Sequence, residues 1–156
     1  MRAVFNILRG EAKNLPYVIF GPPGPGQTVT LVEAVLQMVQ NRILVAATSN
    51  IVADLISKLI IASKALTTGE FIRIVRQSLI KEELIPPELM PHCATLDICA
   101  KETAEDTMLF TKTFPGGHFT HLFMDETGQS TEPETLMPAA LLSKDRGRVI
   151  LAGDPH

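Results

Sequence analysis

The chain has 156 residues, 46% of them hydrophobic, which is enough for one compact domain with a real core and too short for two. Its 14 Lys and Arg residues are outnumbered by 17 Asp and Glu residues, and the net charge of -3 excludes a basic surface over the whole molecule. Nucleic-acid binding would therefore depend on a local patch or on main-chain contacts.

Short β-rich runs alternate with helical patterns in the first half of the chain, which is typical of a parallel sheet covered by helices. Periodicity and capping signals predict five elements there: a strand over 17–20, a helix over 28–40, a strand over 42–47, a helix over 50–64 capped by Asn50, and a short strand over 71–75.

The second half is less regular. Residues 77–117 are broken by prolines and contain only a weak strand-like run at 107–111. A strand is predicted over 118–124, and the capping box from Thr131 to Glu134 predicts the start of a short helix. Residues 148–152 form an apolar run without alternation, which predicts a buried final strand.

A loop rich in glycine and proline follows the first predicted strand and opens the first helix. It matches the phosphate-binding pattern G-x-x-x-x-G-K-[ST] except at the lysine, and its residues are Gly21, Pro22, Pro23, Gly24, Pro25, Gly26, Gln27 and Thr28. Glycines let backbone N–H groups turn towards phosphate oxygens, and a helix N-terminus favours the same anion. The Thr28 hydroxyl is predicted to bind Mg²⁺. The alternative is a strand-to-helix turn without a ligand.

Two residues of this loop weaken the predicted nucleotide site. Gln27 stands where a lysine normally bridges the β- and γ-phosphates, so a charge-assisted contact becomes a neutral one. Pro25 has no N–H to offer a phosphate, and it biases Gly24 away from helical backbone angles. We therefore expect the loop to bind nucleotide poorly.

Acidic residues follow the two late strands. An acidic pair after a strand is common, but Asp125 and Glu126 come about a hundred residues after a phosphate-binding loop. In that setting Asp125 is predicted to hold Mg²⁺ through water and Glu126 to orient the attacking water as the catalytic residue. Asp154, within Gly-Asp-Pro after the last strand, would alone indicate a turn; here it is predicted to contact the nucleotide phosphate.

Together these motifs resemble the first motor domain of superfamily 1 RNA helicases, in the Upf-like branch and the Moloney leukaemia virus 10-like group that includes Armitage. The likeness is carried by residues 16–37, 42–56, 117–138 and 149–155. It implies a three-layer α/β P-loop NTPase (RecA-like) fold with a parallel sheet of four or five strands. In that fold the last strand lies between the strand before the phosphate loop and the strand that ends at Asp125.

The resemblance also implies a function. It implies ATP-driven 5′-to-3′ movement on single-stranded RNA, with ATP and Mg²⁺ as cofactors, in RNA silencing or transposon control and with silencing-complex proteins as partners. Ser49 and Asn50 fall in the motif that contacts the RNA backbone; by their position alone they indicate a helix cap, and the two roles are compatible.

Several departures from the family pattern bear on activity. The family loop reads G-P-P-G-T-G-K-T, so Pro25 and Gln27 are both changes, and Thr48 and Thr127 replace a proline and an alanine. A further strand expected before Gly116 is not visible. The glutamine that follows Gly-Asp-Pro and the second motor domain are missing, so residues 1–156 are expected to form a single, truncated motor domain.

The remaining conspicuous residues favour ordinary roles. Cys93 and Cys99 lack further ligands at metal-binding spacing and are expected to be free thiols. His118 and His121 are expected on opposite sides of a strand, which argues against a shared metal. The expected core methionines are Met38, Met90, Met108, Met124 and Met137.

No membrane segment is expected, because Asp54 and Lys58 interrupt the most apolar stretch, residues 43–66. The N-terminus lacks the long apolar core of a secretory signal. We therefore expect a cytoplasmic domain.

The leading hypothesis is an ATP- and RNA-binding domain of the helicase kind that is inactive in this chain. The alternative is a non-enzymatic remnant that binds a partner or RNA as a scaffold, which Pro25 and Gln27 favour. A small P-loop kinase is disfavoured, because no lid or substrate motif follows the loop.

Overall fold

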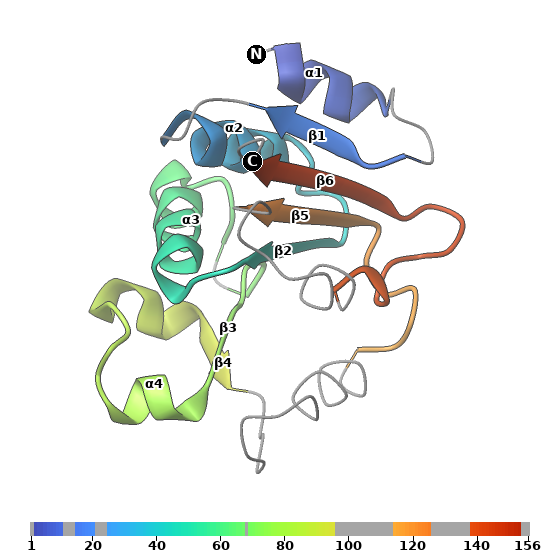
Figure 1. Ribbon diagram of the computed structural model, residues 1–156. Coiled ribbons are helices and arrows are strands. Elements are labelled where there is room, and N and C mark those ends of the chain that lie inside the picture. Colours follow the sequence, from blue (N-terminus) through green and yellow to red (C-terminus); the bar gives the residue numbers. More distant parts are fainter. Residues whose placement is uncertain are drawn as a thin grey trace.

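A computed structural model describes residues 2–10, 15–20, 25–67, 69–95, 114–125 and 138–153 (Figure 1). The elements in chain order are α1 (Arg2–Arg9), β1 (Tyr17–Phe20), α2 (Pro25–Gln37), β2 (Ile43–Ala47), α3 (Asn50–Ser63), β3 (Arg73–Val75), α4 (Gln77–Lys81), the 3-10 helix η1 (Pro87–His92), β4 (Cys93–Thr95), β5 (His121–Asp125) and β6 (Arg148–Gly153).

Four of these strands form one parallel sheet in the order β1-β6-β5-β2. The last strand of the chain, β6, thus lies between β1 and β5, as predicted. Its residues pair with β1 from Tyr17 opposite Ile150 to Phe20 opposite Gly153. Burial on both faces explains why β5 and β6 read as apolar runs without alternation. The predicted α/β class with a parallel sheet is confirmed.

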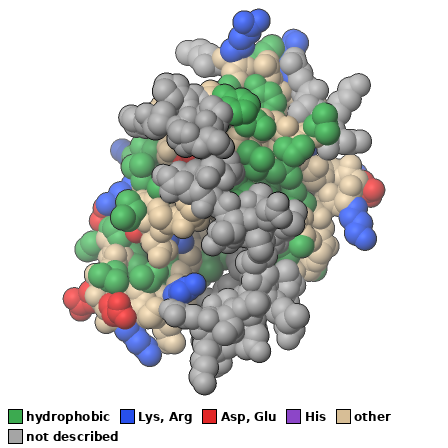
Figure 2. Space-filling model, in the orientation of Figure 1, with side chains coloured by type: hydrophobic (Ala, Val, Ile, Leu, Met, Phe, Trp, Pro, Cys, Tyr) green, Lys and Arg blue, Asp and Glu red, His purple; other side chains and the backbone are tan. Residues whose placement is uncertain are grey.

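The helices α1, α2 and α3 pack on one face of this sheet (Figure 1). Strand side chains alternate between the two faces, so Ile19 of β1 enters this core while Val18 and Phe20 are 40% and 67% exposed. Figure 2 shows hydrophobic side chains gathered on the side of the view where β1 and β6 lie. The buried residues of this core are Val4, Ile7, Ile19, Leu31, Val32, Ala34, Val35, Met38, Ile56, Ile60, Phe123, Ile150 and Ala152. In the described residues the helices of the main core cover one face of the sheet, and the three-layer part of the expected fold stays a prediction.

Helix α2 differs from the prediction in its bounds, and helix α3 differs in its capping residue. Helix α2 begins at Pro25 and ends at Gln37, three residues earlier than expected at each end. Proline suits the first turn of a helix, because the N–H it lacks has no partner within the helix there. Helix α3 is capped by Ser49 rather than by Asn50: the Ser49 hydroxyl accepts a hydrogen bond from the N–H of Val52 at 3.2 Å.

The middle of the chain holds elements that the sequence did not indicate. Strand β3 is shorter than the predicted run over 71–75 and pairs in parallel with β4, in a small sheet separate from the main one. Helices α4 and η1 connect these strands, and Val75, Ile85 and Leu89 form a small core beneath them. The weak run at 107–111 and the capping box at Thr131 lie outside the described residues.

Helix α1 was also missed, although Val4 and Ile7 are buried against α2 and the sheet. Among the methionines described, Met38 and Met124 are buried as predicted, whereas Met90 of η1 is 43% exposed. No helix in the described ranges is long and apolar enough to cross a membrane.

The two histidines do not share a strand. Strand β5 begins at His121, and His118 lies before it with its ring 4.8 Å from that of Phe119. Within the described ranges no cluster of three or more His, Cys, Asp or Glu side chains could hold a metal ion. His121 is 8% exposed and lies opposite Arg148 on β6. Burial, helped by the positive charge of Arg148, lowers the pKa of His121 below its usual 6.5.

The lowered pKa of His121 predicts a loss of stability in weak acid. Below about pH 6.5 the unfolded chain binds a proton at this histidine more readily than the folded chain does. The free energy of unfolding therefore decreases as the pH is lowered. Thermal melts between about pH 7.5 and about pH 5.5 should show a larger drop in melting temperature for the natural chain than for His121→Gln. Equal drops in the two proteins would show that His121 is not the group responsible.

Candidate nucleotide and RNA site

The residues of the predicted site lie at one edge of the main sheet. All four strands are parallel, so their carboxyl ends meet at the edge beside the N-termini of α2 and α3 (Figure 1). In open parallel sheets, ligands bind at this edge, where strands give way to loops. The N–H groups of the first turn of a helix, which lack partners within the helix, also point towards it.

Thr28 and Asp125 meet at this edge, although they are 97 residues apart. The Thr28 hydroxyl in the first turn of α2 donates a hydrogen bond of 2.7 Å to Oδ2 of Asp125 at the end of β5. Asp125 is only 2% exposed, and a buried carboxylate needs such partners. A hydroxyl and a carboxylate in contact are oxygen ligands of the kind that Mg²⁺ prefers, with phosphate and water oxygens to complete the octahedron.

Gln27 contacts the neighbouring strand. Its Nε2 donates a hydrogen bond of 3.4 Å to the carbonyl oxygen of Gly153, the last residue of β6. The side chain that replaces the expected lysine is therefore tied to the sheet through an amide that carries no charge. Residue 27 and its neighbour Thr28 thus connect α2 to the ends of both β6 and β5.

Gly26 leaves room beside the helix terminus. Within the described parts of the chain, a Cβ at this position would meet no atom within 4 Å, so packing gives no reason for a glycine there. A glycine at this position would instead let a phosphate approach the backbone closely, which is the role of glycine in phosphate-binding loops. Pro25 opens α2 without an N–H, so the first turn offers one donor fewer.

The other predicted loop residues, Gly21, Pro22, Pro23 and Gly24, lie outside the described residues. Glu126 and Asp154 also lie outside them, and their preceding neighbours Asp125 and Gly153 end β5 and β6 at this same edge.

Ser49 and Asn50 lie at the carboxyl end of β2, where α3 begins. Ser49 caps the helix, and Asn50 is exposed. The carbonyl oxygen of the Asn50 side chain accepts a hydrogen bond of 3.0 Å from Nη2 of Arg73. Arg73 could not be predicted as a neighbour of Asn50, because the two are 23 residues apart and only the fold brings β3 beside α3.

Comparison with known proteins adds to this geometry. Residues 2–106 match the protein family described as an AAA domain, which covers more than half of the chain. The chain belongs to this AAA domain family. The chain is 47% identical to the Drosophila melanogaster protein named "Probable RNA helicase armi" over 99% of its length. It is 40% identical to human and 39% identical to mouse RNA helicase Mov10l1, in each case over 98% of this chain.

The chain spans 16% of the length of the Drosophila relative and 14% of the two Mov10l1 proteins. The Drosophila alignment extends over 190 residues, more than the 156 of this chain, so that relative carries internal residues that this chain lacks. The predicted resemblance to RNA helicases of the Armitage and Moloney leukaemia virus 10-like group is confirmed.

Proposed function

We propose that this chain is an ATP- and RNA-binding domain of the RNA-helicase kind that binds nucleotide weakly and does not turn it over. The observation that carries this proposal is the contact of 2.7 Å between Thr28 and Asp125, which joins the start of α2 to the end of β5. A phosphate-binding loop and a metal-binding carboxylate must come together in this way to serve one ligand.

The residues at the edge have distinct roles in this proposal. Thr28 and Asp125 would hold Mg²⁺, and the first turn of α2, from Gly26 onward, would face the phosphates with its N–H groups and its positive dipole end. Bound Mg²⁺ would neutralise phosphate charge. Glu126 would orient water and Asp154 would contact the terminal phosphate, each from the residue after a described strand end.

Gln27 and Pro25 set the limit on activity. A charged lysine would bridge the phosphates, whereas the amide of Gln27 is neutral and donates to Gly153. Pro25 removes a donor from the same turn. Both losses affect contacts to the phosphates, where charge develops during phosphoryl transfer. They therefore weaken the binding of the nucleotide and also the stabilisation of the transition state.

RNA would bind along the same edge, at Ser49 and Asn50 beside the carboxyl end of β2. The similarity to proteins named as RNA helicases supports RNA as the polymer. Work in RNA silencing, with silencing-complex proteins in the cytoplasm, belongs to the proposal because the resemblance implies it. The same relatives give no support to a small P-loop kinase.

The 156-residue chain is expected to show no RNA-stimulated ATPase activity. Phosphate release would be measured with excess single-stranded RNA, because the loss of the bridging lysine falls on the reacting phosphates. Turnover above background that disappears in Glu126→Gln would contradict the proposed inactivity. Absence of turnover together with absence of nucleotide binding would favour the second candidate, a non-enzymatic scaffold, for which Gln27 and Pro25 are the specific observations.

A further inference from the structure

A polar network links the start of α3 to the small sheet formed by β3 and β4. Arg73 of β3 extends its guanidinium towards α3, where Nη2 donates to Oδ1 of Asn50 at 3.0 Å and Nε lies 3.3 Å from Oδ1 of Asp54. Asn50 and Asp54 are four residues apart and therefore lie on the same side of the helix. Arg73 thus bridges two consecutive turns of α3 with a single side chain.

Arg73 is held firmly in this position. Its Nη1 donates a hydrogen bond of 2.6 Å to the carbonyl oxygen of Ile74, so all three guanidinium nitrogens have partners. The side chains of Arg73 and Asp54 are only 14% and 18% exposed, so solvent and salt screen their ion pair less than they screen a surface pair. Because the planar guanidinium is already held by several partners, it loses little further side-chain entropy when it also orients Asn50.

This arrangement fixes which way the Asn50 amide faces. An arginine side chain only donates hydrogen bonds, so the atom of Asn50 that meets it must be the carbonyl oxygen. The amide nitrogen then points away from Arg73, and in the described parts of the chain it makes no hydrogen bond of its own. Asn50 therefore presents two N–H donors to solvent beside the carboxyl end of β2.

We propose that Arg73 is a positioning residue for RNA binding, which holds Asn50 so that its amide N–H groups face a backbone phosphate of the bound strand. This inference rests on the proposed RNA site at Ser49 and Asn50. A pure donor suits a phosphate oxygen and carries no base preference, so the contact recognises single-stranded nucleic acid through its backbone. Arg73 itself does not contact the RNA, because its charge is paired with Asp54.

The test measures the affinity of the full 156-residue chain for a fluorescein-labelled oligouridine by fluorescence anisotropy. Asn50→Ala should weaken binding about tenfold to 100-fold, the usual effect of losing a hydrogen bond to a charged acceptor. Arg73→Lys should weaken it by a similar factor. A lysine keeps the positive charge beside Asp54, but it lacks the fork that reaches Asn50 at the same time.

The double variant separates positioning from direct contact. If Arg73 acts only through Asn50, the Arg73→Lys, Asn50→Ala double variant should bind RNA no more weakly than Asn50→Ala alone. If the two losses multiply, Arg73 acts on the RNA independently and the inference is wrong. It is also wrong if Asn50→Ala weakens binding and Arg73→Lys does not. If neither Asn50→Ala nor Ser49→Ala changes the affinity, or if the natural chain binds no RNA, the proposed RNA site itself fails.

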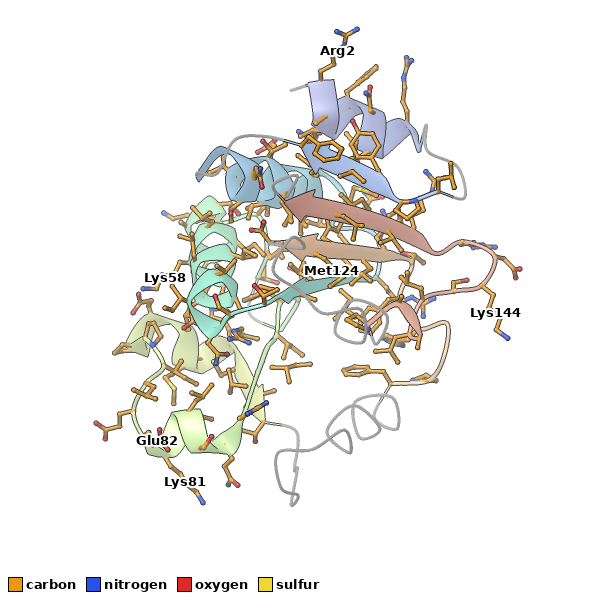
Figure 3. The ribbon with its side chains drawn as sticks, viewed as in Figure 1. Arg2, Lys58, Lys81, Glu82, Met124 and Lys144 are labelled. Atoms are coloured by element: carbon orange, nitrogen blue, oxygen red, sulfur yellow. The ribbon has the colours of Figure 1, made fainter. Side chains whose placement is uncertain are left out.

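Lys58 of α3 provides the matched control. Its amino group forms an ion pair of 3.0 Å with Glu88, and both side chains are about half exposed. Figure 3 shows Lys58 pointing away from the sheet on the outer side of α3. Lys58→Gln removes a positive charge and an ion pair from the same helix, and it should change the RNA affinity less than twofold. Thermal melts of all variants would identify any loss of affinity that comes from unfolding; Arg73→Lys, which keeps the ion pair, is chosen to melt near the natural chain.

Discussion

Deletion of residues 147–156 is expected to abolish cooperative folding. The deletion removes β6, which pairs with β1 on one side and with β5 on the other. Within the described residues β1 has no other partner in the main sheet, so it would lose its place there. Ile150 and Ala152, which are 2% and 0% exposed, would also leave the core that lies beneath α2. Their loss opens a groove through the sheet, and backbone groups of β1 and β5 lose their hydrogen-bonding partners.

Deletion of the first eight residues is the comparison, and it removes most of helix α1. Helix α1 contributes Val4 and Ile7 to the main core, at 5% and 4% exposure. Burial of each stabilises the fold by about 1.5–3 kcal/mol, which is a large share of a net stability of about 5–15 kcal/mol. We expect the melt to remain cooperative, because no sheet pairing is lost, and to occur at a clearly lower temperature, because buried apolar side chains are lost.

Thermal melts followed by circular dichroism distinguish the two deletions. The N-terminal deletion should keep a sigmoidal transition, and the C-terminal deletion should show none. A cooperative transition in the C-terminal deletion, near that of the whole chain, would mean that β6 does not lie between β1 and β5.

The strands of the main sheet could be predicted from the sequence because they are short runs of apolar residues. The run over 17–20 has the bounds of β1, and the run over 148–152 falls one residue short of β6. The position of β6 within the sheet came from the family resemblance, since a run of apolar residues does not reveal its neighbours. Thr28 and Asp125 were each predicted as a ligand of Mg²⁺ from their motifs, and the structure brings the two side chains into contact.

Short elements and long-range polar contacts escaped prediction for physical reasons. Strand β4 has three residues and α4 has five, and segments this short are too brief for alternation or a helical repeat to be recognised in the sequence. Ser49 and Asn50 are both good capping residues, so a pattern cannot choose between adjacent positions. The contact of Arg73 with Asn50 depends on the packing of the small sheet against α3, which no local pattern encodes.

Restoration of the phosphate-binding loop is expected to have the largest effect on nucleotide binding. Gln27→Lys returns a charge-assisted contact, which is worth about 1.5–3 kcal/mol against about 1 kcal/mol for a neutral one. Pro25→Thr returns an N–H donor to the first turn of α2. Both changes act on the same phosphates, so they should couple, and the double variant should bind ATP·Mg²⁺ roughly 30-fold to 100-fold more tightly than the natural chain.

Gln37→Lys is the matched control for the added charge. Gln37 ends the same helix and is exposed, with its amide bonded to Glu33 at 2.6 Å. It lies ten residues from Gln27, so a lysine there is about 15 Å away along the axis and does not approach the phosphates. This variant should bind nucleotide as the natural chain does.

Titration of Pro25→Thr, Gln27→Lys with a fluorescent ATP analogue, with and without Mg²⁺, tests most directly whether this edge of the sheet is a weakened nucleotide site. The account predicts a gain in affinity that exceeds that of either single variant, depends on Mg²⁺, and is reduced by Thr28→Val, which removes the hydroxyl that contacts Asp125. Equal, weak binding by the natural chain and the double variant, with both proteins folded, would contradict it.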